Sequence, residues 1–482
     1  MSSFKLKIHR LSMNIFRALI LLLPVFTSFS ALNAQKNHQI NVQITGYTEG
    51  SSVKLVGNYA DQNFLADTAR FAAEGKISFK SVEGFAEGLY YLLLPDDRNC
   101  SFFVVNGEEN FTIRSTKDNL TLGMTAEGSL ENQLFFDNQR YQSALEAKFN
   151  ALNQQAQMVQ PAEQAALKAQ LQPLLDERDA KILALREQYP NALFPKFKQA
   201  GQNPKIRFSF RANGALDSAA TLINFRKDWW NGCDFADGRL VRTPVFFNKL
   251  KKYIDEYTPQ NPDSIIASID YLLAKTLNTK DLHKPTVSWL LGKYKPLQTK
   301  LMDGEAVYSY LVLKYMTPDL FPDLDNKDLK STQERAQEMR SSLVGMIGQN
   351  VWGKDKSGVK RSLYDLNAPI KIVYIYYTDC EHCKAETPKL REVYDKWHKR
   401  GVDIFSIGGN VKERADWLNF EKNYGINWTN VMDPMLESKF NEKYFIDNTP
   451  EIYVLDKNFR IIAKNLKPEQ LPEVFEKELN KQ

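Results

Sequence analysis

Polar and apolar positions alternate in short segments near the start of the chain. Between residues 35 and 128, apolar side chains fall on every second position of several short runs, and glycines separate these runs. The first run places Ile40, Val42 and Ile44 on one face. Short alternating segments punctuated by glycine are typical of a small sandwich or barrel. We therefore expect a β-rich, sandwich-like module over residues 35–128.

The apolar pattern changes its period after residue 128. Over residues 129–340, apolar positions recur at helical spacings, as in Leu167, Leu171 and Leu174. This period places side chains on one face of an α-helix. The sequence predicts a mostly α central region, whose aromatic clusters we expect to fill cores rather than bind a cofactor.

The C-terminal part, residues 341–482, combines both patterns. The continuous apolar run Ile370–Tyr377 fits a strand buried on both faces, as in a parallel sheet. Leu390, Val393 and Trp397 follow at spacings of three and four, which predicts a helix. The composition, with 482 residues of which 43% are hydrophobic, allows two or three globular domains.

Cys380 and Cys383 lie between this strand and this helix. A cysteine in the first turn of a helix faces unpaired N–H groups and the positive end of the helix dipole, which favour thiolate. The second cysteine, three residues on, shares the helix face and is close enough to form a disulfide with the first. We predict Cys380 as the attacking thiolate and Cys383 as the resolving thiol.

The segment after the cysteines carries a family resemblance. Cys-x-x-Cys followed by Lys384-Ala385-Glu386-Thr387-Pro388 resembles the exported TlpA/ResA-like thiol–disulfide oxidoreductases, which have a thioredoxin fold. The β and helical parts resemble modules of unassigned function that precede such domains. The fold class is therefore expected to be multidomain, with an all-β module, a mostly α region and a C-terminal α/β thioredoxin fold.

Thr449-Pro450 is the second mark of the resemblance. In the thioredoxin fold this proline is cis and lies beside the disulfide, where the neighbouring backbone can pair with an extended substrate. The remaining elements follow the βαβ–ββα order of that fold. One predicted helix in this order is marked by Leu436, Phe440 and Tyr444.

Three further residues are candidates for supporting roles. Glu386 stands one helical turn after Cys383 and could relay protons to it. His382 resembles the oxidising type of site, in which a cationic imidazole stabilises the thiolate, whereas the carboxylate of Glu381 disfavours thiolate. The dipeptide between the cysteines therefore does not fix the redox direction.

The chain departs from the family at two positions. Asp379 precedes the first cysteine, where the family usually has tryptophan. Tyr374 replaces the buried acid that thioredoxins carry on the preceding strand.

Other uses of Cys-x-x-Cys fit less well. Structural zinc needs four ligands, and no histidine follows His398, which also argues against a copper carrier of this fold. Tyr377 stands where a peroxidase of this fold would have threonine. We expect no metal and no organic cofactor.

Residues 1–34 read as a secretory signal peptide, with a basic start, the apolar core Ala18–Phe26 and the small residue Ala34 before Gln35. Removal of its four basic residues lowers the formal net charge from +5 to +1. A nearly neutral chain is a poor nucleic-acid binder. We expect a periplasmic or cell-envelope protein with no membrane-spanning segment in the mature chain.

The sequence thus predicts an exported enzyme that exchanges disulfides with protein thiols, as a reductase rather than an oxidase, and draws on an upstream electron donor. The alternative is a cell-envelope binding or structural protein whose Cys-x-x-Cys forms a structural disulfide. Cys100 and Cys233 stand apart, and the sequence leaves open whether they pair or remain buried thiols.

Overall fold

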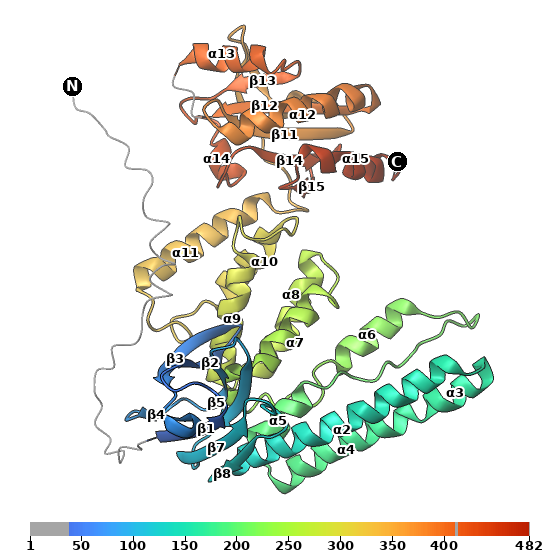
Figure 1. The fold of residues 1–482 in the computed structure, drawn as a ribbon. Helices are drawn as coiled ribbons and strands as arrows, with labels where there is room; N and C mark the ends of the chain where they lie inside the picture. Colours follow the sequence, from blue (N-terminus) through green and yellow to red (C-terminus); the bar gives the residue numbers. More distant parts are fainter. Residues whose placement is uncertain (1–37, 410–412, 482) are drawn as a thin grey trace.

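The computed structural model describes residues 38–409 and 413–481, so the predicted signal peptide lies outside the described residues. Figure 1 shows a β-rich part in blue, a helical part from teal to yellow, and an orange-to-red α/β domain at the opposite end from the β-rich part. The predicted multidomain fold class is confirmed.

The N-terminal part contains two four-stranded sheets, in the orders β4-β1-β7-β8 and β3-β2-β5-β6. Side chains of both sheets enter one hydrophobic core, including Ile40 of β1 and Leu55 of β2. The strands are β1 His38–Thr45, β2 Ser52–Tyr59, β3 Gln62–Arg70, β4 Lys76–Ser81, β5 Gly88–Leu93, β6 Asn99–Val104, β7 Asn110–Thr116 and β8 Thr125–Glu127.

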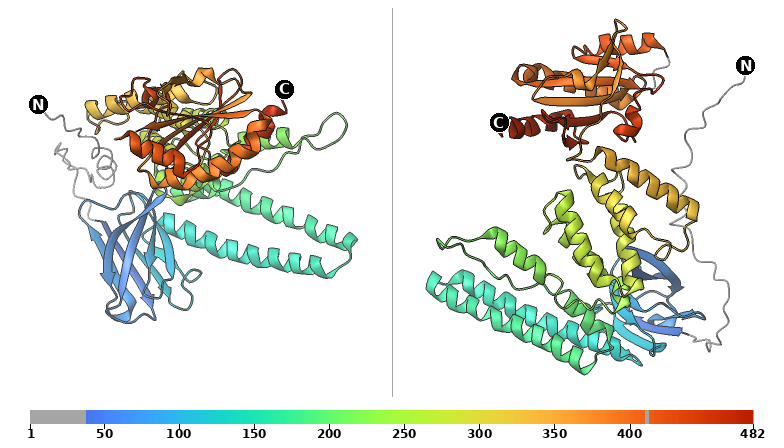
Figure 2. Two further views of the ribbon diagram at one scale, coloured as in Figure 1. Left: turned by 90° about the horizontal axis from the view of Figure 1, so that it is seen from above. Right: turned by 180° about the vertical axis from the view of Figure 1, so that it is seen from behind.

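The central part is helical, as predicted. Helices α2 and α4, with α3 at their far end, form an arm that projects to one side in every view (Figures 1 and 2). The amide of Asn132 on α2 ties the arm to the sandwich, because it pairs with both backbone groups of Phe103 at 2.7 and 2.8 Å. The helices are α2 Leu130–Met158, α3 Pro161–Ala169, α4 Leu171–Gln188, α5 Leu193–Ala200, α6 Ser218–Asp228, α7 Pro244–Asp255, α8 Pro262–Thr276, α9 Lys280–Tyr294, α10 Gly304–Tyr315 and α11 Asn326–Met339.

The C-terminal domain is built on a seven-stranded sheet in the order β10-β9-β13-β12-β11-β14-β15. Strand β11 runs parallel to β12 and antiparallel to β14. The elements are β9 Trp352–Lys354, β10 Lys360–Ser362, β11 Ile370–Tyr377, α12 Glu381–Trp397, β12 Val402–Gly409, α13 Arg414–Asn423, β13 Thr429–Met432, α14 Phe440–Lys443, β14 Glu451–Leu455, β15 Ile461–Lys464 and α15 Leu471–Leu479.

Alternate side chains of β11 enter two different cores. Tyr374 packs in the core that contains Cys383 and Leu390 of α12, whereas Val373 packs in the core that contains Phe440. The strand is thus buried on both faces, as its continuous apolar run predicts.

Two details differ from the sequence prediction. Strand β13 was not predicted. The helix marked by Leu436, Phe440 and Tyr444 is only the short α14, because Leu436 and Lys439 adopt φ values of +55°. Left-handed residues at these positions prevent a helix from starting earlier.

In the part of the chain that the structure describes, no helix is both long enough and apolar enough to span a bilayer.

Candidate active site

Cys380 forms the N-cap of α12. Its backbone is extended, with φ −82° and ψ 119°, and its Sγ atom accepts a hydrogen bond from the backbone N–H of Cys383 at 3.2 Å. The buried strand β11 ends three residues earlier, at Tyr377, and so fixes where the helix starts. The sulfur atom thus accepts a hydrogen bond from one of the N–H groups that have no partner within the first turn of the helix. Because the positive end of the helix dipole lies at this terminus, negative charge on the sulfur is favoured.

The two cysteines differ in exposure and in acidity. Cys380 is partly exposed, and Cys383 is fully buried. Burial acts to raise the pKa of the Cys380 thiol, but hydrogen bonds with the side chains of Cys383 and Thr449, and with the backbone of Cys383 and His382, lower this pKa by more, so that it lies below its ordinary value. Burial raises the pKa of the Cys383 thiol to about 12. The arrangement favours a thiolate on Cys380 and a protonated thiol on Cys383.

The Thr449-Pro450 segment lies beside the first cysteine. The peptide bond between the two residues is cis, as predicted. The thiol of Cys380 donates a hydrogen bond to the carbonyl oxygen of Thr449 at 3.3 Å. Two segments far apart in sequence therefore meet at one sulfur atom.

Sequence comparisons find relatives of the C-terminal domain that carries these residues. The profile of the AhpC/TSA family matches residues 344–464. Thiol-disulfide oxidoreductase ResA from Bacillus cereus is 28% identical over 138 residues, which are 29% of this chain and 78% of ResA. The C-terminal domain belongs to the thioredoxin-like thiol–disulfide oxidoreductases. A profile named DUF4369, a domain of unknown function, matches residues 38–135 of the β-rich part.

Two solved structures are similar to this chain, one over the oxidoreductase domain and the other over a larger part of the chain. A domain of a possible thiol-disulfide isomerase from Cytophaga hutchinsonii is 35% identical; the match covers 29% of this chain and 97% of that one, with a TM-score of 0.27. For a thioredoxin-like protein from Bacteroides caccae, the match covers 57% of this chain and 99% of that one, at 17% identity and a TM-score of 0.46.

Tyr374 lies beneath the cysteines of the oxidoreductase domain. Its hydroxyl group is 2.6 Å from Oγ1 of Thr387, which donates a hydrogen bond to the carbonyl oxygen of Cys383 at 2.6 Å. Burial raises the pKa of Tyr374 well above its ordinary value. A neutral hydroxyl group therefore occupies the place at which thioredoxins have a buried acid.

The predicted supporting residues have different surroundings. Glu381 and His382 are exposed, and Glu381 pairs with Lys384 at 2.6 Å. Glu386 is largely buried; one of its oxygens pairs with Lys389 at 2.9 Å, and the other is buried without a partner among the described residues. Of the three, only Glu386 offers an acceptor that is shielded from solvent.

Asp379, the residue that departs from the family pattern, is exposed and lines a hollow of about 330 Å³. This hollow lies between the start of α12, represented by Lys384, and α13, represented by Phe420, with Tyr424 directly after α13. An exposed acidic residue, Asp379, therefore directly precedes Cys380 at the position where the family's tryptophan would present an apolar surface.

The helical region contacts the loop that carries Thr449. Arg335 of α11 forms an ion pair with Asp447, and its guanidinium group lies 5.0 Å from the ring centre of Phe445. Sequence reasoning missed this contact, because nothing in the local pattern around Arg335 points to a partner more than a hundred residues away.

The other two cysteines are separate free thiols. Cys100 is buried on β6, and Cys233 lies in the central region after α6. Burial raises the pKa of each thiol to about 12, so both are poor nucleophiles. Within residues 38–409 and 413–481, no three histidine, cysteine or acidic side chains gather in a way that could hold a metal ion.

Proposed function

We propose that this protein is an exported thiol–disulfide oxidoreductase that reduces disulfides of other proteins in the cell envelope. The observation that carries the proposal is the contrast between a partly exposed Cys380 with a lowered thiol pKa and a buried Cys383 with a raised one. Nucleophilic attack needs a thiolate that a large substrate can reach, and only Cys380 meets both conditions.

In the first step, the Cys380 thiolate attacks one sulfur of a substrate disulfide. The substrate S–S bond breaks, one substrate sulfur leaves and takes up a proton, and a mixed disulfide with Cys380 remains. In the second step, Cys383 loses its proton and attacks the sulfur of Cys380. The second substrate thiol is released, and two electrons have passed from the enzyme dithiol to the substrate disulfide.

The product of this cycle is a Cys380–Cys383 disulfide, so a further dithiol must reduce the enzyme again. We propose an upstream protein electron donor for this step. Glu386 is the candidate acceptor for the Cys383 proton, and the backbone of Thr449 is the candidate partner for an extended substrate segment.

We also propose a separate role for each part of the chain. Residues 1–34 direct export to the periplasm or cell envelope, residues 341–482 carry the redox chemistry, and residues 35–128 and 129–340 form two modules that hold this domain and its substrates. The contact of Arg335 with the Thr449 loop supports a positioning role for the helical module.

A trapping experiment tests the proposal. Cys383→Ser keeps the nucleophile but removes the resolving thiol, so mixed disulfides with envelope proteins should accumulate on non-reducing gels. The matched control is Cys380→Ser/Cys383→Ser, which retains Cys100 and Cys233 and should trap nothing. Empty lanes for both variants would count against disulfide exchange and favour a binding protein with a structural disulfide.

A further inference from the structure

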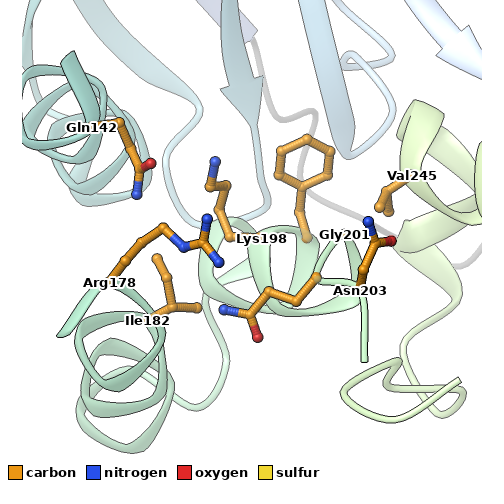
Figure 3. A pocket seen from close by; sticks show the side chains of 9 residues that line it. Gln142, Arg178, Ile182, Lys198, Gly201, Asn203 and Val245 are labelled. Carbon is orange, nitrogen blue, oxygen red and sulfur yellow. The ribbon is translucent and has the colours of Figure 1, made fainter. Parts of the chain in front are cut away.

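A hollow of about 320 Å³ lies at the base of the helical arm, far from the cysteine pair along the length of the molecule (Figures 1 and 3). Its walls come from Gln142 on α2, Arg178 and Ile182 on α4, Lys198 on α5, and Val245 on α7. Side chains from four different helices therefore converge on one space, which the redox mechanism does not use.

The lining of this hollow is positively charged and contains no acidic residue. Arg178 is neutralised by its neighbour Asp179, which accepts hydrogen bonds from the guanidinium group at 2.8 and 2.9 Å. Lys198 is half-buried and has no acidic partner in the described part of the chain. Burial, with the nearby charge of Arg178 as a smaller cause, lowers the pKa of the Lys198 amine. Of the two cations that line this hollow, Lys198 is therefore the one without an acidic partner among the described residues.

Gln142 adds an unpaired donor. Its Nε2 atom is buried and has no hydrogen-bond partner among the described residues, although buried amide groups are normally paired. Figure 3 shows the amide of Gln142, the guanidinium group of Arg178 and the side chain of Lys198 around one space between α2, α4 and α5. A buried donor beside an unbalanced cation is the arrangement that an oxygen anion would satisfy.

The rest of the lining is apolar. Ile182, Phe197 and Val245 provide aliphatic and aromatic surface next to the polar groups. A second hollow of about 240 Å³ adjoins the first, contains Trp229 and Lys249, and is likewise lined by no acidic residue. The two hollows share four residues, namely Phe197, Gly201, Asn203 and Val245.

We propose that the hollow at the base of the arm binds a small organic anion with an apolar body. The carboxylate is held by Gln142, Arg178 and Lys198, and the body lies along Phe197 and Val245 toward the second hollow. Few polar groups that converge within a partly apolar cavity are the usual features of a small-molecule site. Inorganic anions alone would leave the apolar walls in contact with water.

Octanoate is a suitable probe, and calorimetric titration of the full mature chain measures its binding. Two matched compounds separate the contributions: 1-octanol has the same chain without charge, and inorganic phosphate has charge without an apolar body. We expect saturable binding of octanoate, and affinities at least about tenfold weaker for both comparison compounds, since one charge-assisted hydrogen bond corresponds to about tenfold in affinity. Equal binding of octanol, equal binding of phosphate, or no binding of octanoate would each overturn the proposal.

Lys198→Met removes the charge and keeps the length of the side chain. Octanoate affinity should fall about tenfold, while the melting temperature of the free protein should not fall, because an unbalanced and partly buried cation has been removed. Lys198→Arg, which keeps the charge, should retain most of the affinity and guards against a folding artefact. Wild-type affinity in Lys198→Met would overturn the assignment.

Lys168→Met is the matched control. Lys168 is exposed on α3, at the far end of the same arm, and its substitution changes the net charge by the same amount. We expect unchanged octanoate affinity. An equal loss of affinity in both methionine variants would show an effect of overall charge and would overturn the proposed site.

Discussion

The Sγ atom of Cys380 lies 3.3 Å from the carbonyl oxygen of Thr449, 69 residues later in the chain. The sheet creates this proximity, because β14 pairs with β11 so that Glu451 stands opposite Ile375, next to the end of the strand that leads to Cys380. The partly exposed first cysteine therefore meets the Thr449-Pro450 segment, while Cys383, on the first turn of α12, is buried in the core that contains Tyr374 of β11.

The first prediction concerns the order of alkylation. With the reduced protein at neutral pH, iodoacetamide should modify Cys380 at least about tenfold faster than Cys383, because thiolate fraction and access both favour Cys380. Mass spectrometry of peptides quenched over time measures both rates. The pH midpoint for Cys380 should lie below that of free cysteine, in keeping with its lowered pKa. Equal rates, or faster modification of Cys383, would reverse the assigned roles.

The second prediction concerns Glu386. If its carboxylate accepts the Cys383 proton, Glu386→Gln should slow release of the mixed disulfide by roughly a hundredfold and leave the first attack unchanged. Stopped-flow measurement with a fluorescent mixed disulfide separates these steps. Glu381→Gln changes the same charge on the exposed side of the helix and should have little effect. Similar slowing in both variants would point to a general charge effect instead.

The third prediction concerns a buried acid between the helical region and the oxidoreductase domain. Asp303 accepts a hydrogen bond from the backbone N–H of Val344 at 2.8 Å. Burial raises the pKa of Asp303 to about 7, although the charge of Lys464 opposes this shift. In the unfolded chain the pKa is near its ordinary 3.8. The group therefore contributes most stability below about pH 4, and this contribution is lost as pH rises through 7.

Asp303→Asn keeps an acceptor for Val344 and removes the charge. The variant should match the wild type near pH 4 and exceed it near pH 8, by up to roughly 4 kcal/mol in the free energy of unfolding. Urea unfolding at the two pH values measures this difference. Asp319→Asn, at an exposed position, is the control and should show no such pH dependence. A variant that is less stable than the wild type at pH 8 would contradict the account of this interface.

The strand and helix around Cys380 and Cys383 were largely predictable from sequence because their signals are local. The apolar run of β11, the cysteine spacing and the helical period of Leu390 and Trp397 all lie within one short segment. Strand β13, Thr429–Met432, was missed because it has only four residues and its place depends on pairing with β12. Short segments of this kind take their structure from tertiary contacts rather than from their own pattern.

The contacts between the parts of the chain were not predictable. Glu305 accepts a hydrogen bond from Asn465 at 2.7 Å across 160 residues of sequence, and Lys464 lies 3.7 Å from the same carboxylate. Likewise, Gln142 and Lys198 face one hollow only because α2 and α5 pack together. The spacing of apolar residues along the sequence does not predict which distant helices will pack together.

The reduction potential of the Cys380–Cys383 pair tests the central claim most directly. The full mature protein would be equilibrated with dithiothreitol or glutathione buffers of defined potential, and free thiols would be labelled and assigned by mass spectrometry. A catalytic pair should be half-reduced at a potential above about −300 mV. A disulfide that stays oxidised at more negative potentials would instead be structural, and would contradict a role for this pair in disulfide exchange.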